Sequence, residues 1–158
     1  MEADLLSQKR GHRHFIGGMQ HHVPSALVMF APYVNSYRRL TQAASAPVNT
    51  KWGYDNRTTA FRVPRSEPAG RRVENRIPSS DANPYLALAG SLACGLIGML
   101  KKEAPDQPVG IAANEDEIEL PRGLLEAVEL FEKDAALADL LGRPFTSTYA
   151  AIKRAEFE

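Results

Sequence analysis

The chain has 158 residues, with 44% hydrophobic and 24% charged residues, a formal net charge of zero and one cysteine. The length corresponds to about one domain, and the composition is ordinary for a soluble globular protein. The lone cysteine, Cys94, excludes a disulfide framework within the chain and favours a reducing, cytoplasmic setting.

Two features argue against secretion and membrane insertion. The N-terminus begins with acidic residues and has no apolar segment of the signal-peptide type. The longest uncharged run, residues 82–100, contains Asn83, Pro84 and several small residues. A membrane span needs about 20 apolar residues, so this run predicts a buried helix, and we expect no membrane partner.

The N-terminal part predicts one interrupted helix. Residues 1–13 are polar and basic without strong periodicity, which indicates an irregular entry. Apolar residues then recur three and four positions apart over residues 14–29, with an interruption expected near Pro24. His21 and His22 lie in this segment. No carboxylate at metal-binding spacing accompanies them, so we interpret them as surface or hydrogen-bonded histidines rather than metal ligands.

Three short strands are expected next, after a loop over residues 41–47. They cover residues 50–54, 58–63 and 71–77, divided by the turn residues Asp55 and Asn56 and by a segment rich in proline and glycine. Side chains alternate across a strand, so Arg72, Glu74 and Arg76 share one face of the third strand. A charge cluster and an apolar core are therefore predicted on opposite faces.

The second half of the chain predicts helices. Asn83 and Pro84 form a helix start, and the helix over residues 85–102 carries small residues on one side and a ridge of larger ones on the other. The ridge consists of Leu88, Leu92, Leu96 and Met99. An acidic loop over residues 103–121 precedes helices over 121–133 and 134–141 and from near Pro144. The class expected is α+β, with short antiparallel strands packed by helices and a helical C-terminal half.

Charge is concentrated in the middle of the chain. Residues 38–76 hold eight arginines and one lysine against three acids, whereas residues 103–158 hold thirteen acids against five bases. Arginine matches carboxylate and phosphate oxygens with two parallel hydrogen bonds, so a focused site for a small anion is predicted. The alternative is a solvated strand face with cross-strand ion pairs. Nucleic acid is disfavoured because no stacking aromatic residues or groove-fitting basic helix accompany the arginines.

A glutamate between two arginines suits a hard cation that shares phosphate oxygens with it. That combination is typical of phosphoryl transfer, in which positioning and electrostatic stabilisation supply most of the catalysis. One carboxylate is too few to hold the metal.

Several motifs in this order resemble the C-terminal part of the catalytic domain of glutamine synthetase. They are Asn35-Ser36-Tyr37-Arg38-Arg39, Ala46-Pro47, Trp52-Gly53-Tyr54-Asp55-Asn56-Arg57, Arg72-Val73-Glu74-Asn75-Arg76 and Asp81-Ala82-Asn83-Pro84-Tyr85-Leu86. The segment from Trp52 to Arg57 is similar to the branch that includes γ-glutamylpolyamine synthetases. Flanking segments extend the resemblance over nearly the whole chain.

The resemblance implies a ligase that phosphorylates the side chain of glutamate with ATP and lets ammonia or a polyamine attack the acyl phosphate. It implies ATP and magnesium, with manganese as the alternative, as cofactors. It assigns Arg57 and Arg76 to catalysis, Arg39 and Arg76 to the substrate, Arg72 to the nucleotide phosphates and Glu74 to the metal. A homo-oligomer is also expected.

The chain departs from the family pattern in three places. Ser45 occupies the position of a catalytic glutamate, which favours an amine other than ammonia or no turnover, and the segment around Ala69 lacks a lysine. Residues 1–158 are expected to form a single partial domain without the family's N-terminal β-grasp domain and its other metal ligands. The chain is therefore predicted to be inactive alone, and the alternative is a non-catalytic fragment that only self-associates or binds anions.

Overall fold

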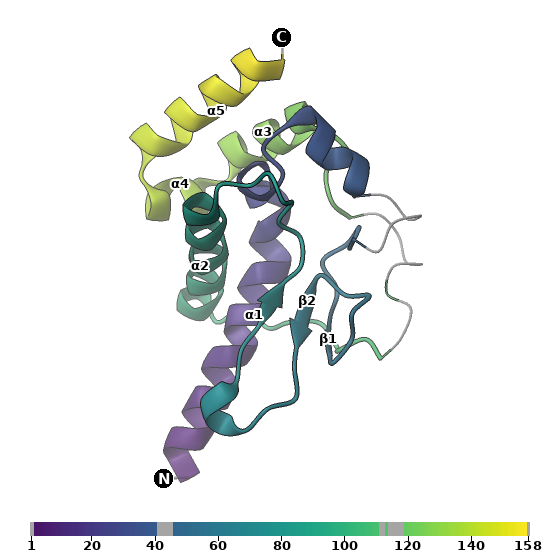
Figure 1. Ribbon diagram of the computed structural model, residues 1–158. Helices are drawn as coiled ribbons and strands as arrows, with labels where there is room; N and C mark the ends of the chain where they lie inside the picture. The colour runs from purple at the N-terminus through teal and green to yellow at the C-terminus, as the bar shows by residue number, and fades with distance from the viewer. Residues whose placement is uncertain (1, 41–45, 111–112, 114–118, 158) are drawn as a thin grey trace.

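Figure 1 shows a computed structural model that describes residues 2–40, 46–110, 113 and 119–157. The helices are α1 (Glu2–Phe30), α2 (Pro84–Lys101), α3 (Leu124–Lys133), α4 (Ala135–Leu141) and α5 (Arg143–Phe157), with 3-10 turns η1 (Val34–Arg39) and η2 (Pro68–Gly70). The strands are β1 (Trp52–Tyr54), β2 (Phe61–Val63) and β3 (Glu74–Asn75). The predicted α+β class and helical C-terminal half are confirmed.

Helix α1 is the central element of the fold. It packs along α2 on one side, the small sheet lies on the other, and α3 covers its C-terminal end (Figure 1). Its apolar stripe of Ile16, Met19, Val23 and Leu27 is fully buried. The predicted irregular start and the break near Pro24 were wrong, because α1 runs through both. Burial of this stripe stabilises a helix that local propensity alone would not.

The sheet has the order β1-β2-β3. Strand β2 pairs antiparallel with β3, as predicted, but parallel with β1, which corrects the expectation of antiparallel strands throughout. A compact loop causes the difference. Asp55 adopts a left-handed φ of 49°, and Asn56 Oδ1 accepts hydrogen bonds from the Thr58 amide and hydroxyl at 2.9 and 2.7 Å. The chain thus folds back and enters β2 in the direction of β1.

The two sides of α2 have different environments. Asn83 caps the helix by accepting from the amides of Tyr85 and Leu86, and Pro84 is its first residue, as predicted. The small residues Cys94 and Gly98 are buried against α1. Burial raises the pKa of the Cys94 thiol.

The ridge of larger residues on α2 is exposed, contrary to the prediction of a buried scaffold helix. Leu88, Leu92, Leu96 and Met99 are 60%, 54%, 42% and 44% exposed. Among the described residues, this helix alone is long and apolar enough to cross a membrane, and 33% of it is buried. One such helix is weak grounds for a membrane span, because core helices share the same length and composition.

His22 links three segments of the fold. Its Nδ1 lies 2.9 Å from Asp134 Oδ2 and its Nε2 lies 3.3 Å from Glu103 Oε1. The hydrogen bond to Asp134 raises the pKa of His22. His22 is therefore a hydrogen-bonded histidine, as predicted.

The acidic loop before α3 is partly described. Glu119 accepts hydrogen bonds from the Thr50 amide and hydroxyl at 2.8 and 2.7 Å, which ties the loop to the start of the sheet. The neighbouring acids at 115–117 lie outside the described residues. Gly142 ends α4 with a φ of 93°, as its position predicted.

The contact between α1 and α2 depends on glycine. A Cβ added to Gly18 would lie 2.6 Å from Gly98 Cα, closer than real side chains approach backbone. We therefore predict that Gly98→Ala lowers the free energy of unfolding by roughly 3 kcal/mol, because the helices must separate. Urea unfolding measures this value. The control is Gly110→Ala, since no described residue has an atom within 4 Å of a Cβ added there, and equal effects of both substitutions would contradict the prediction.

Candidate functional site

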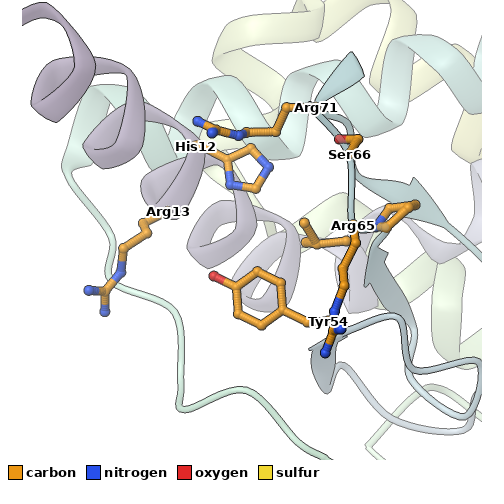
Figure 2. A pocket seen from close by; sticks show the side chains of 8 residues that line it. His12, Arg13, Tyr54, Arg65, Ser66 and Arg71 are labelled. Carbon is orange, nitrogen blue, oxygen red and sulfur yellow. The ribbon is translucent and has the colours of Figure 1, made fainter. Parts of the chain in front are cut away.

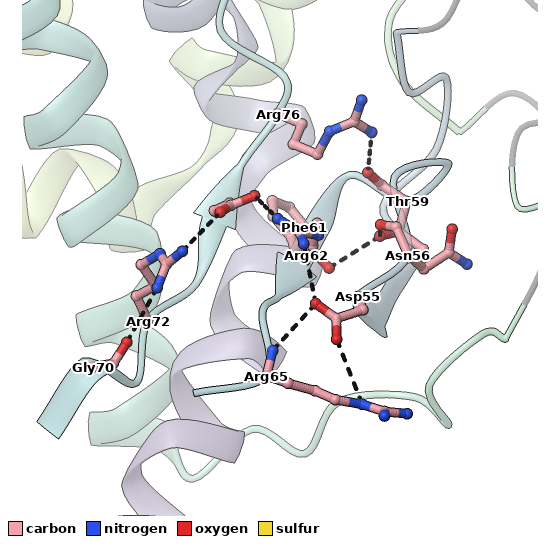
Figure 3. A network of polar contacts seen from close by, with 10 residues as sticks. Asp55, Asn56, Thr59, Phe61, Arg62, Arg65, Gly70, Arg72 and Arg76 are labelled. Atoms are coloured by element: carbon pink, nitrogen blue, oxygen red, sulfur yellow. Dashed lines mark hydrogen bonds and ion pairs between the residues drawn. The ribbon is translucent and has the colours of Figure 1, made fainter. Parts of the chain in front are cut away.

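The outer face of the sheet carries a cluster of charged side chains, centred on the pairing of β2 with β3. Arg62 and Glu74 are direct partners in this antiparallel pair, which places their side chains on one face. Arg62 Nη1 lies 2.8 Å from Glu74 Oε2, and its Nη2 lies 3.0 Å from Asp55 Oδ1 (Figure 3). One guanidinium therefore connects two carboxylates from different segments.

Arg62 was missed as a candidate in the sequence analysis. The signal was present, because Arg62 stands between the apolar Phe61 and Val63, and both of these are buried. An arginine between two core residues must point to the opposite face of a strand. Its partner was not predictable, since that requires the register of β2 against β3.

Glu74 is held by two arginines. Besides Arg62, Arg72 Nη2 lies 3.5 Å from Glu74 Oε1. The hydrogen bond from Arg62 is the main cause of a lowered pKa of Glu74, with smaller contributions from the charges of Arg72 and Arg57. Glu74 is therefore stabilised in its ionised form, and its oxygens contact the guanidinium groups of Arg62 and Arg72.

Arg76 and Arg57 lie close enough to repel each other. Arg76 Nη1 donates to the Thr59 carbonyl at 3.0 Å (Figure 3). Burial and then the charge of Arg57 lower the pKa of Arg76. Arg57 is exposed, and no carboxylate of the described chain lies within ion-pair distance of it. Glu74 acts on both arginines through its charge, but among the described contacts neither forms the direct ion pair that Arg62 has.

Arg39, at the end of η1, joins the same cluster. Its guanidinium donates to the Ile77 carbonyl, and its Nε is buried without a hydrogen-bond partner among the described residues. Burial and then the charge of Arg76 lower the pKa of Arg39, whereas Asp81 opposes that change. Asp81 is fixed in turn by Ser36, whose hydroxyl donates to it at 2.8 Å.

The structure thus brings all five predicted site residues to one region. Arg39, Arg57 and Arg76 influence one another electrostatically, and Arg72 and Glu74 meet through an ion pair. The predicted alternative of cross-strand ion pairs is also realised, between Arg62 and Glu74. Their individual roles stay predictions, and Ser45 lies outside the described residues.

Chemically, the cluster suits an anion with several oxygens. Six guanidinium groups, including that of Arg65 beside Asp55, face three carboxylates, and the cationic excess lies around Arg39, Arg57 and Arg76. Guanidinium pairs with phosphate or carboxylate through two parallel hydrogen bonds. Glu74 is the predicted metal ligand of this cluster. The described residues supply no group of three His, Cys, Asp or Glu side chains that could hold a metal.

The fold and the cluster define the class: an α+β domain that presents a cluster of arginines on one face of a helix-backed sheet. The family profile described as glutamine synthetase, catalytic domain, matches residues 3–158. The chain therefore belongs to the glutamine synthetase family.

The similar proteins include both glutamine synthetases and a γ-glutamylethanolamide synthetase. A glutamine synthetase of Thermococcus kodakarensis is 41% identical over 154 residues, which cover 92% of this chain and 34% of the relative. A γ-glutamylethanolamide synthetase, GlnA4, of Streptomyces coelicolor is 37% identical over 147 residues, covering 92% of this chain and 32% of the relative. The chain thus spans about a third of the length of these curated relatives.

Solved structures agree with the sequence comparison. The ligand-free structure of GmaS has a TM-score of 0.81 and 37% identity, covering 94% of this chain and 34% of that chain. A complex of GmaS with ADP also has a TM-score of 0.81, at 36% identity, covering 94% of this chain and 36% of that chain.

The interaction of Arg62 with Glu74 is testable by titration. We predict that Arg62→Met raises the pKa of the Glu74 carboxyl towards its ordinary value of about 4.3, because the principal hydrogen bond to the carboxylate is lost. With Arg62 present, the interaction stabilises the folded protein at pH values above the ordinary pKa of glutamate. This stabilisation is lost as pH falls through the lowered pKa of Glu74. Carbon-detected NMR of the Glu74 carboxyl measures the change.

The control for this titration is Arg65→Met. Arg65 contacts Asp55 at 3.4 Å and has no ion pair with Glu74 among the described contacts. The pKa of Glu74 should therefore stay unchanged in this variant. An unchanged pKa in Arg62→Met would refute the assignment.

Proposed function

We propose that the chain supplies the arginine side of the active site of an ATP-dependent glutamate–amine ligase. In this reaction the side-chain carboxylate of glutamate attacks the terminal phosphorus of ATP, giving γ-glutamyl phosphate and ADP. An amine then attacks the acyl carbon, and phosphate leaves. The observation that carries the proposal is the cationic excess on one face, where Arg39 and Arg76 are partly buried and repel each other, and where the charges of Asp81 and Glu74 offset that repulsion only in part.

Each arginine has a proposed place in this chemistry. Arg39 binds the glutamate substrate, Arg57 contacts the transferring phosphoryl group, and Arg76 contacts the reacting carboxylate or phosphate. Burial and then repulsion by neighbouring arginines lower the pKa of Arg39 and Arg76, and an arriving anion would offset the repulsion. Charge stabilisation by preorganised donors of this kind is the main source of catalysis in phosphoryl transfer.

Arg72 and Glu74 are proposed to serve the nucleotide side. Arg72 is exposed, so its guanidinium is accessible to the phosphates of ATP. Magnesium, or manganese as the alternative, is the cofactor expected with ATP, and Glu74 would supply one ligand. The described residues do not fit a complete metal site, so further ligands would come from another segment of polypeptide.

The amine substrate is left open between ammonia and a larger amine. The relatives include glutamine synthetases and a γ-glutamylethanolamide synthetase. Ser45, where the resemblance expects a glutamate that would help to deprotonate ammonia, favours the larger amine. A cytoplasmic enzyme fits the unpaired thiol of Cys94, which is buried.

Because these residues span about a third of the curated relatives, we predict no turnover by the chain alone. We expect activity when it replaces the matching segment of the Thermococcus kodakarensis glutamine synthetase in a chimera. Phosphate release should then require ATP, glutamate, magnesium and an amine together. Arg76→Ala in the chimera should reduce the rate by about a hundredfold, the loss typical of one charge-stabilising donor.

The matched control in the chimera is Arg143→Ala. Arg143 is an exposed arginine on α5 that pairs with Asp139 at 2.6 Å, away from the cluster. Its removal should leave the rate unchanged. A folded chimera that binds ATP but never releases phosphate under these conditions would exclude the ligase assignment.

A second function, self-association, is favoured by the exposed ridge of α2. We infer that this ridge packs against the same ridge of a second copy of the chain, with the two α2 helices antiparallel about a two-fold axis. Lys101 and Lys102 follow the ridge and Asp81 precedes it. Antiparallel packing places the lysines of one copy near the acidic start of the other helix and opposes the two helix dipoles. An exposed apolar stripe of this extent is typical of interaction surfaces.

We predict that Leu92→Glu, at the middle of the ridge, shifts the chain from dimer to monomer in sedimentation-velocity ultracentrifugation. A buried carboxylate without a partner would be unfavourable at that interface. Ile152→Glu on α5 is the control, because Ile152 is 49% exposed and lies outside the ridge. Leu92→Cys should form a disulfide-linked dimer, since the native Cys94 is buried. A chain that is monomeric at all concentrations would contradict this inference.

A further inference from the structure

A second basic hollow lies on the other face of the sheet, between β1, β2 and the N-terminal half of α1. It has a volume of about 480 Å³, a size typical of small-molecule sites. Figure 2 shows its main lining side chains, contributed by α1, by β1 and by the segment after β2: His12, Arg13, Tyr54, Arg65, Ser66 and Arg71. We call it the helix-side pocket.

The helix-side pocket is distinct from the arginine cluster. Val63 lines the pocket, whereas its neighbour Arg62 points to Glu74 on the opposite face. Likewise, Arg71 lines the pocket while Arg72 pairs with Glu74. Successive side chains of an extended segment point to opposite faces, so the pocket and the arginine cluster lie on opposite faces of these segments, and Asp55 links them by pairing with both Arg62 and Arg65.

The pocket has positive charge and an unused hydrogen-bonding atom. Its described lining contains no acidic residue, and neither Arg13 nor Arg71 forms an ion pair with the described part of the chain. His12 Nε2 is buried without a partner among those residues, which is unfavourable for a polar atom unless a ligand or water satisfies it. Figure 2 shows the His12 ring beside the Arg71 side chain.

An aromatic side chain forms another wall. Tyr54 is 58% exposed, and its ring makes an edge-to-face contact with Trp52 at a centroid distance of 5.3 Å. Val63 and Pro64 add apolar surface. A flat organic group would bury this surface by stacking on the tyrosine.

We propose that the helix-side pocket binds a small phosphate ester with a flat organic body. The phosphate lies against Arg71 and His12, with Arg13 at the rim, and the body lies on the ring of Tyr54. This site is independent of the ligase chemistry, and its residues take no part in that proposal. Arg65 pairs with Asp55 at 3.4 Å, so its charge is already partly balanced and it contributes less to binding the phosphate than Arg71 does.

The test uses the intact 158-residue chain and phenyl phosphate as the probe. The chain has four histidines and five tyrosines, so the ring signals of His12 and Tyr54 can be followed individually by NMR. Phenyl phosphate should shift both signals in a saturable manner. Binding should also raise the pKa of His12, which burial and the charge of Arg71 lower in the free protein, because a dianion favours the imidazolium.

Variants separate the parts of the proposal. Arg71→Ala should weaken binding about tenfold or more, the effect of losing a hydrogen bond to a charged group. Tyr54→Ala should make phenyl phosphate bind no better than inorganic phosphate. Arg72→Ala is the matched control, because this adjacent arginine faces the opposite side and the His12 and Tyr54 shifts should persist. Circular dichroism verifies that each variant is folded.

Three results would overturn the proposal. The first is the absence of a saturable shift at His12 and Tyr54. The second is loss of those shifts in Arg72→Ala but not in Arg71→Ala, which would move the ligand to the arginine cluster. The third is an equal response to phenol, which would show that the phosphate is not recognised.

Discussion

The close crossing of α1 and α2 is the constraint on which the rest of the structure depends. Gly18 and Gly98 allow the two backbones to touch, and no side chain fits between them. Because α2 covers one side of α1, the apolar residues Ile16, Met19 and Val23 of α1 are buried in the core. The helix then forms a rigid support for the sheet, and three short strands that would be unstable alone become a platform for charged side chains.

Because side chains alternate along a strand, the sheet places apolar side chains on one face and charged side chains on the other. On β2, Phe61 and Val63 are buried while Arg62 turns outward to Glu74 and Asp55. Because Arg62 has two carboxylate partners, it fixes the positions of the surrounding groups and adds little free positive charge. The excess charge belongs instead to Arg57 and Arg76, which have each other as neighbours. Arg62 is thus fixed by two ion pairs, whereas Arg57 and Arg76 have none among the described contacts.

The sequence supported some of these features and not others, for physical reasons. The Asn83 cap and the shared face of Arg72, Glu74 and Arg76 depend on local geometry, so they were predictable. The continuity of α1 through Pro24 and the parallel pairing of β1 depend on tertiary packing and on the left-handed Asp55, which periodicity does not encode. The exposed ridge of α2 was mispredicted because hydrophobic spacing shows that a face is apolar, but does not show what covers it.

The helices and the arginine cluster are also coupled directly, which bears on how the site keeps its shape. The Asn75 side chain, on β3 beside Glu74, donates to the Ser91 hydroxyl on α2 at 3.0 Å. The same Asn75 accepts from the Ile77 amide at 3.1 Å, and the Ile77 carbonyl receives the guanidinium of Arg39. A single chain of hydrogen bonds therefore runs from α2 through β3 to Arg39. Since α2 is positioned by its crossing with α1, the position of Arg39 depends on helix packing as well as on the short strands.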